Sequence, residues 1–198
     1  MPYGAKVIGT GTIAIDPDAE VTRDRYYTDI DPVLLKGFAP QELTEDVPKE
    51  PAGFRYQADA LVSDVGLSSG QYRLYDFSRT VTGFFSLNIR AAEETVLYIL
   101  FDEVLTDGRV DPHRARWCNI LKYVLAPGQY ELVSFEAYSA RYATVAVTRG
   151  QAEISDFSMV RYENPDVRPL ADYGDPELNA IVQAAAQYIH ECTKTPAP

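Results

Sequence analysis

Short runs of β-branched and aromatic residues alternate with Gly, Pro and Asp turns through most of the chain between residues 61 and 162. The runs recur about every 8–15 residues, which is typical of an antiparallel β-sandwich. In the run 83–90, Leu87 and Ile89 fall on one face of a strand, and Asn88 and Arg90 fall on the other. One-sided burial produces this alternation, so the pattern predicts a mainly β fold in two stacked layers. The expected strands are residues 6–15, 71–77, 83–90, 95–105, 117–125, 130–135, 142–149 and 154–162, with 71–77 and 83–90 as the first pair.

The run 95–105 differs from the others because it is apolar on both faces at its centre. Such a run predicts an inner strand that is covered on both sides. The four residues Thr106-Asp107-Gly108-Arg109 follow it and have the composition of a tight turn.

The two ends of the chain do not share this rhythm. Residues 32–58 carry four prolines, which forbid a long helix and disfavour central strands, so this part is expected to form an extended arm on the sandwich. Near the other end, Asp175-Pro176-Glu177 reads as a helix start, with an N-cap Asp, a Pro at the first helical position and an early acid. Apolar residues then recur at helical spacing as far as Ile189, and this stripe predicts one helix whose apolar face must be packed against something.

Composition and charge narrow the classes of function. The chain has 198 residues, of which 46% are hydrophobic, so it can bury a core. Its 18 basic and 29 acidic residues give a net charge of −11, which argues against nucleic acid or an anionic membrane as a partner. The sequence shows no signal peptide and no apolar run near the ~20 residues that span a bilayer, so a cytoplasmic location is expected. Cys118 and Cys192 lie far apart, which favours two reduced thiols over a disulfide.

Acidic residues form the main concentration of candidate chemistry. Asp102, Glu103, Asp107 and Asp111 surround the end of one strand and its turn. A glycosidase needs two carboxyl groups across a sugar, but acids at a strand end more often form a solvated rim. A sugar contact and a Ca²⁺ contact at this rim stay open, although the spacing is not that of an EF-hand and no cofactor is expected.

Trp117 is the only tryptophan, and Arg116 and Asn119 flank it. An aromatic platform beside hydrogen-bonding groups is what sugar recognition uses, whereas the alternative is that Trp117 caps the core. The candidate sugar-binding residues are therefore Trp117, Asn119, Arg116, Glu103 and Asp107.

Several groups of residues, taken in order, resemble the accessory β-sandwich of bacterial α-L-rhamnosidases, which are glycoside hydrolases. They are Tyr75-Asp76-Phe77 with Gly83-Phe84, Phe101-Asp102-Glu103-Val104-Leu105 with Asp107-Gly108, Arg116-Trp117-Cys118-Asn119, Ser134-Phe135-Glu136 with Arg141-Tyr142, and Tyr162-Glu163-Asn164-Pro165. The later segment Asp175-Pro176-Glu177-Leu178-Asn179 resembles the entry to the family's (α/α)₆ catalytic barrel. The resemblance extends over roughly residues 20–190, and the order and spacing of the groups carry it.

The resemblance implies a jelly-roll, galactose-binding-like β-sandwich with an extended N-terminal arm and one C-terminal α-helix. It divides the chain into residues 1–60 (strand and arm), 61–165 (sandwich) and 166–198 (linker and the first helix of a truncated barrel). In that family the barrel holds the acids of an inverting hydrolysis, so no catalytic residue is carried over to this chain. The implied partners are the missing barrel or another chain against the helix, and a rhamnose-containing glycan. A free-standing carbohydrate-binding module and a sugar-independent interaction or oligomerisation domain remain as alternatives.

Overall fold

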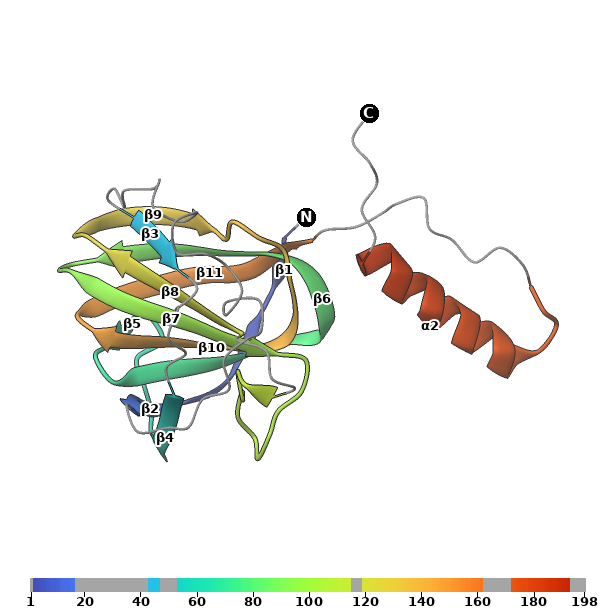
Figure 1. The fold of residues 1–198 in the computed structure, drawn as a ribbon, viewed down its shortest axis with the longest axis horizontal. Coiled ribbons are helices and arrows are strands. Elements are labelled where there is room, and N and C mark those ends of the chain that lie inside the picture. Colours follow the sequence, from blue (N-terminus) through green and yellow to red (C-terminus); the bar gives the residue numbers. More distant parts are fainter. Residues whose placement is uncertain (1, 17–42, 47–52, 115–118, 162–171, 193–198) are drawn as a thin grey trace, which may run out of the picture.

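The computed structural model describes residues 2–16, 43–46, 53–114, 119–161 and 172–192. Within these ranges the chain is an antiparallel β-sandwich followed by a helix (Figure 1). The elements are β1 (Tyr3–Gly4), β2 (Lys6–Asp16), β3 (Leu43–Asp46), β4 (Gly53–Asp59), β5 (Gly66–Ser68), β6 (Gln71–Ala91), β7 (Thr95–Asp102), β8 (Ile120–Leu125), β9 (Gly128–Val133), β10 (Tyr138–Arg149), β11 (Gln151–Arg161) and α2 (Pro176–Cys192).

The long strand β6 belongs to both layers of the sandwich. Its first part, Gln71–Asp76, pairs with β2 and β10, and its second part, Gly83–Ala91, pairs with β11 and over most of its length with β9. The strand bends near Ser78, which has a φ of 67° and whose N–H donates to Asp76 Oδ1 at 2.6 Å. The sequence pattern predicts residues 71–77 and 83–90 as two paired strands, and that prediction is wrong. They are one strand because a local positive φ bends the chain without ending its ladder.

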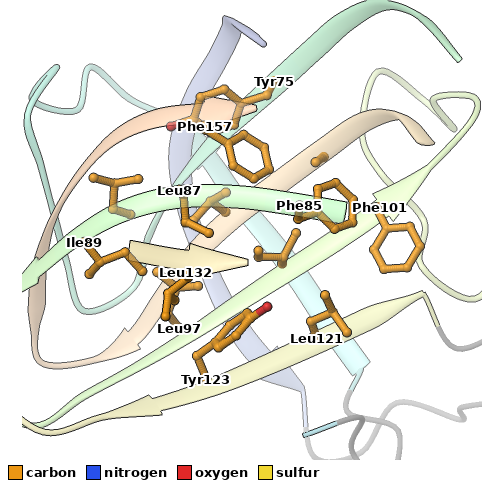
Figure 2. Packing of buried hydrophobic residues seen from close by; sticks show 14 of the residues in the cluster. Tyr75, Phe85, Leu87, Ile89, Leu97, Phe101, Leu121, Tyr123, Leu132 and Phe157 are labelled. Carbon is orange, nitrogen blue, oxygen red and sulfur yellow. The ribbon is translucent and has the colours of Figure 1, made fainter. Parts of the chain in front are cut away.

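The strand order follows from the way β6 passes from one layer to the other. One layer runs β4–β2–β6–β10–β7–β8–β3, and the other runs β9–β6–β11, with β1 and β5 on the free edge of β11. The main core fills the space between the layers, where Phe85 meets Phe101 at a ring-centroid distance of 5.2 Å and Phe157 at 5.8 Å (Figure 2). Burial of each such side chain contributes roughly 1.5–3 kcal/mol, so this aromatic group is a large part of what holds the layers together.

The strand β7 is an inner strand that is buried on both faces, as its sequence predicts. Leu97 and Phe101 face the main core, and Leu100 faces a second cluster on the other side of the same layer. The second cluster also contains Val110, which is 1% exposed and comes from the loop after β7. That loop therefore covers the outer face of the layer, and this covering positions the candidate site.

Two short stretches of the expected N-terminal arm are strands. β3 pairs with β8 and β4 pairs with β2, so both lie at the edges of one layer. The prolines of the arm, Pro32, Pro40, Pro48 and Pro51, lie outside the described residues. Edge positions agree with the expectation that this proline-rich part would not supply a central strand.

The helix α2 begins where the sequence predicts. The side chain of Asp175 accepts hydrogen bonds from the backbone N–H groups of Glu177 and Leu178 at 2.9 and 3.2 Å, which is an N-cap. Three of its large apolar residues are open to solvent, since Leu178 is 43%, Ile181 61% and Ile189 46% exposed. In the part of the chain that the structure describes, no helix is both long and apolar enough to cross a membrane.

Candidate functional site

The candidate site is the loop Glu103–Arg114, which leaves β7 and folds back over the sheet. Glu103 and Asp107 are exposed on this loop, and Asn119 is half-buried where the chain enters β8. The backbone of Asn119 joins the loop to β7, because its N–H donates to the carbonyl of Pro112 at 3.0 Å and its carbonyl accepts from the N–H of Phe101 at 3.1 Å. The structure thus places three of the five predicted sugar-binding residues around one loop. The other two, Arg116 and Trp117, lie outside the described residues.

The tip of the loop is the tight turn that the sequence predicts. Thr106 and Arg109 exchange two backbone hydrogen bonds, at 2.8 and 3.0 Å. Asp107 and Gly108 between them have φ angles of 50° and 75°, the left-handed geometry that Asp tolerates and Gly favours. The turn holds the Asp107 carboxylate out in solvent, where it can accept hydrogen bonds from a ligand.

An ion pair between a buried acid and a partly exposed arginine joins the two ends of the loop. Arg114 donates from Nε to Asp102 Oδ2 at 2.6 Å and from a terminal nitrogen to Oδ1 at 2.7 Å, so the pair is bidentate. The Asp102 side chain is only 4% exposed, and its Oδ1 also accepts from the N–H of Glu103 at 2.7 Å. The sequence grouped Asp102 with the acids of a solvated rim. The structure buries it instead, because a partner twelve residues away neutralises its charge.

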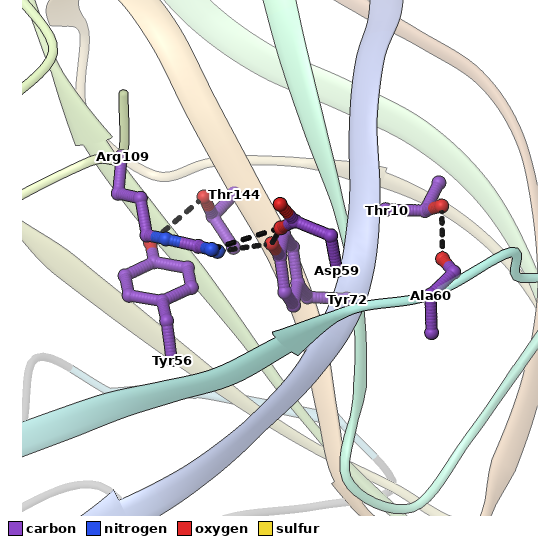
Figure 3. A network of polar contacts seen from close by, with 7 residues as sticks. All are labelled: Thr10, Tyr56, Asp59, Ala60, Tyr72, Arg109 and Thr144. Carbon is purple, nitrogen blue, oxygen red and sulfur yellow. Dashed lines mark hydrogen bonds and ion pairs between the residues drawn. The ribbon is translucent and has the colours of Figure 1, made fainter. Parts of the chain in front are cut away.

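A second set of contacts fastens the middle of the loop to the sheet (Figure 3). Arg109 donates to the hydroxyl of Tyr72 and to Asp59 Oδ1, the latter at 2.8 Å, and Tyr72 donates to the same oxygen at 3.3 Å. The guanidinium carbon also lies 4.9 Å from the centre of the Tyr56 ring, a cation–π distance. Sequence reasoning missed these residues, since they come from β4, β6 and the loop and no local pattern joins them.

Tyr56 is the buried end of this network. Its hydroxyl donates to the carbonyl of Val110 at 3.1 Å and also shares a hydrogen bond with the Thr144 hydroxyl at 3.0 Å. Burial raises the pKa of Tyr56 from 10.0 to about 12, with smaller opposing contributions from its hydrogen bond and from Arg109. The folded state therefore holds the phenolic proton more tightly than the unfolded chain does.

This difference predicts a loss of stability at high pH. Below pH 10 the contribution of Tyr56 is fully present, and it falls as the pH rises from 10 towards 12, because the unfolded chain ionises first. A rise of two pKa units corresponds to about 2–3 kcal/mol. We expect Tyr56→Phe to reduce the alkaline slope in urea unfolding measured between pH 8.5 and 11, and part of the slope should remain because burial also raises the pKa of Tyr72 and of Tyr75. The exposed Tyr173 on the helix segment supplies the control Tyr173→Phe, which should leave the slope unchanged.

The four acids at the end of β7 and in the loop have different roles. Asp102 is an ion-pair anchor, and Asp111 Oδ1 accepts from the N–H of His113 at 3.0 Å, which leaves Glu103 and Asp107 to face solvent. A glycosidase acid keeps its proton in an apolar, buried setting, and neither exposed carboxylate has one. Among the residues that the structure describes, no group of three or more His, Cys, Asp or Glu side chains could hold a metal ion. The exposed rim, Glu103 and Asp107, is suited to accept hydrogen bonds from hydroxyl groups.

The fold and the site together define an antiparallel β-sandwich with an acidic loop that is anchored to it after β7. A crystal structure of the GH78 family rhamnosidase of Bacillus sp. GL1 is similar with a TM-score of 0.53 and 17% identity, over 68% of this chain and 14% of that one. The rhamnosidase from Klebsiella oxytoca with rhamnose bound is similar with a TM-score of 0.51 and 15% identity, over 98% of this chain and 36% of that one. At such identities the likeness shows the fold, and the chain corresponds to well under half the length of either enzyme. No protein-family model matches the sequence, and no curated protein matches it.

Proposed function

We propose that this chain is a non-catalytic accessory β-sandwich of an α-L-rhamnosidase-like glycoside hydrolase, and that it supports a catalytic barrel. The observation that carries the proposal is the match to the Klebsiella oxytoca rhamnosidase, which spans 98% of this chain but only 36% of the enzyme. Because the match extends over nearly the whole chain, sandwich and helix together correspond to a minor part of a larger hydrolase. The chemistry then belongs to the part that this chain does not match.

The exposed face of α2 supports the same role. A helix of 17 residues is marginal in water unless its apolar side is packed, and Leu178, Ile181 and Ile189 are each more than 40% exposed. A helical barrel that received this face would bury those side chains, at about 25 cal/mol per Å² of apolar surface. The helix would then serve as the joint between sandwich and barrel.

The direct test is enzyme activity. We expect the purified 198-residue chain to release no nitrophenol from nitrophenyl α-L-rhamnoside, because its loop acids are either locked in contacts or exposed. Turnover that tracks the protein through purification and is lost in Glu103→Gln or Asp107→Asn would overturn the non-catalytic assignment. The exposed Glu131 supplies the matched control Glu131→Gln, which should have no effect.

A second candidate function is that of a carbohydrate-binding module, which the exposed rim of the anchored loop favours. Titration calorimetry with rhamnose and rhamnogalacturonan fragments separates the two, since heat that is lost on Asp107→Asn but kept on Glu131→Gln indicates a sugar site at the loop. Absence of heat with all of these sugars leaves the scaffold role. A sugar-independent oligomerisation domain would instead show a dimer in sedimentation that a chain shortened at Leu170 loses.

A further inference from the structure

A cavity of about 530 Å³ lies between the two layers on the side of β1 and β2, and it is lined differently from the Glu103–Arg114 loop. This volume is in the range of small-molecule sites, roughly 300–1,000 Å³. Its walls combine apolar side chains with a few polar ones. The polar residues among its lining are Asp64, Arg73, Tyr75, Ser155, Asp156 and Ser158.

Arg73 is a buried cation at this cavity, with 3% of its surface exposed. One terminal nitrogen donates to the carbonyls of Ser63 at 2.5 Å and Gly66 at 3.3 Å, and the other donates to the carbonyl of Ile154 at 3.3 Å. Within the described ranges these partners are neutral oxygens and no carboxylate is paired with the guanidinium. A fully buried arginine is ordinarily paired with an acid, so among the described residues this positive charge lacks its usual counter-ion.

Tyr75 stands beside Arg73 on the same strand and also lines the cavity. A phenolic hydroxyl can donate its hydrogen and a guanidinium can only donate, so Tyr75 and Arg73 together offer hydrogen-bond donors at the wall of the cavity. Burial raises the pKa of Tyr75, with smaller opposing contributions from Arg73, so this donor keeps its proton at neutral pH. Edge-on contact with Phe157, at a ring-centroid distance of 4.7 Å, holds the ring in place.

Acceptors lie at the exposed border of the cavity. Asp64 and Asp156 are both exposed and both line it. The Asp156 carboxylate accepts from Asn88 at 2.9 Å and from Ser155 at 3.1 Å, which fixes its direction. Exposed carboxylates repel an anion weakly, since the interaction is screened by water, whereas the buried guanidinium attracts it through a lower dielectric. The cavity therefore has donors in its depth and acceptors at its border.

We propose that this cavity binds a small hydroxylated carboxylate, with the carboxylate at Tyr75 and Arg73 and the hydroxyl groups at Asp64 and Asp156. The ligand supplies the negative charge that Arg73 lacks and takes the hydrogen of the Tyr75 phenol. Its hydroxyls donate to the two border acids, which a simple anion could not satisfy. The proposal concerns the isolated sandwich and does not rest on the rhamnosidase-like function.

The test is calorimetric titration of the full chain at pH 7 with D-glucuronate, D-glucose and acetate. We expect glucuronate to bind at least tenfold more tightly than glucose, which lacks the carboxylate, and more tightly than acetate, which lacks the hydroxyls. Tyr75→Phe should weaken glucuronate binding about tenfold or more, the loss expected for one hydrogen bond to a charged group. Equal affinity for glucuronate and glucose, or no binding of glucuronate, would overturn the proposal.

A second pair of variants keeps the test independent of any effect of Tyr75→Phe on folding. Val7 lines the cavity and is 51% exposed, so Val7→Trp fills the space from the surface without disturbing the core. Ile8 is the next residue of β2, is 49% exposed and does not line the cavity, so Ile8→Trp is the matched control. Loss of glucuronate binding in Val7→Trp but not in Ile8→Trp supports the site. If both variants still bind glucuronate, the binding occurs elsewhere and the proposal is refuted.

Discussion

Replacing Gly83 by Ala is expected to destabilise the fold by about 3 kcal/mol or more, which is at the upper end for overpacking. A Cβ at this position would lie 2.3 Å from the carbonyl oxygen of Val160 and 2.9 Å from its carbonyl carbon. Real contacts of this kind are longer than 3 Å, so the backbone of β6 or β11 would have to move. It cannot move easily, because Gly83 is in register with Arg161 on one side and Tyr138 on the other.

The measurement is the midpoint of urea unfolding followed by fluorescence or circular dichroism. Gly4→Ala is the matched control, since it lies in β1, has no positive φ and would meet nothing within 4 Å. We expect the control to remain within about 0.5 kcal/mol of the parent. A Gly83→Ala chain that unfolds at the parent's midpoint would show that the crossing of β6 between the layers is not as close as described.

Removing the partner of the buried Asp102 is the second change with a large expected effect. Arg114→Met removes two donors from the Asp102 carboxylate, which is 4% exposed, and leaves the Glu103 N–H as its donor among the described residues; leaving a buried acceptor short of partners costs about 1–3 kcal/mol. When Asp102→Asn is combined with Arg114→Met, the charge that would be left unpaired is also removed. The loss of stability in the double variant should therefore be smaller than the sum of the losses in the two single variants. The difference, measured as a double-mutant cycle, should be at least about 1 kcal/mol.

The same variant tests whether the pair holds the candidate site in place. Amide hydrogen exchange in residues 103–110 should speed up in Arg114→Met, while exchange in the core strand β7 should change only with global stability. Arg149 supplies the control, because its ion pair with Glu94 is exposed, at 60% and 63% of the two side chains. Arg149→Met should cost less than about 1 kcal/mol. A loop that exchanges no faster in Arg114→Met would mean that the contacts of Arg109 and Tyr72 are sufficient to hold it.

The loop after β7 shows how far sequence reasoning reaches at a site. The turn at Asp107 and Gly108 could be read directly, since its residue types follow from backbone conformation. The different roles of the acids could not be predicted, because Asp102 and Glu103 are adjacent and are chemically alike. One is buried and paired, and the other is exposed, and this depends on where Arg114 lies after folding.

The network around Arg109 also could not be predicted from the sequence. Arg109 reaches Tyr72 and Asp59, which are separated from it by 37 and 50 positions in the chain. No local pattern predicts contacts over such distances, and tyrosines in strands read as ordinary strand residues. The predicted boundaries of the arm, sandwich and linker stay predictions, and so does sugar binding by Trp117, Arg116 and Asn119.

The sequence by itself determined where most of the longer strands lie, that β7 is buried on both faces and where α2 begins. These properties follow from the alternation of side chains along a strand and from the capping chemistry of a helix, both of which act within a few residues. Only the tertiary structure decided that β6 is one bent strand in two layers, which acid near the loop is buried, and that Arg73 faces a cavity with no acidic partner in the described ranges. Each of these depends on contacts between segments distant in the chain, whose energies come from packing and charge and leave no periodic trace in the sequence.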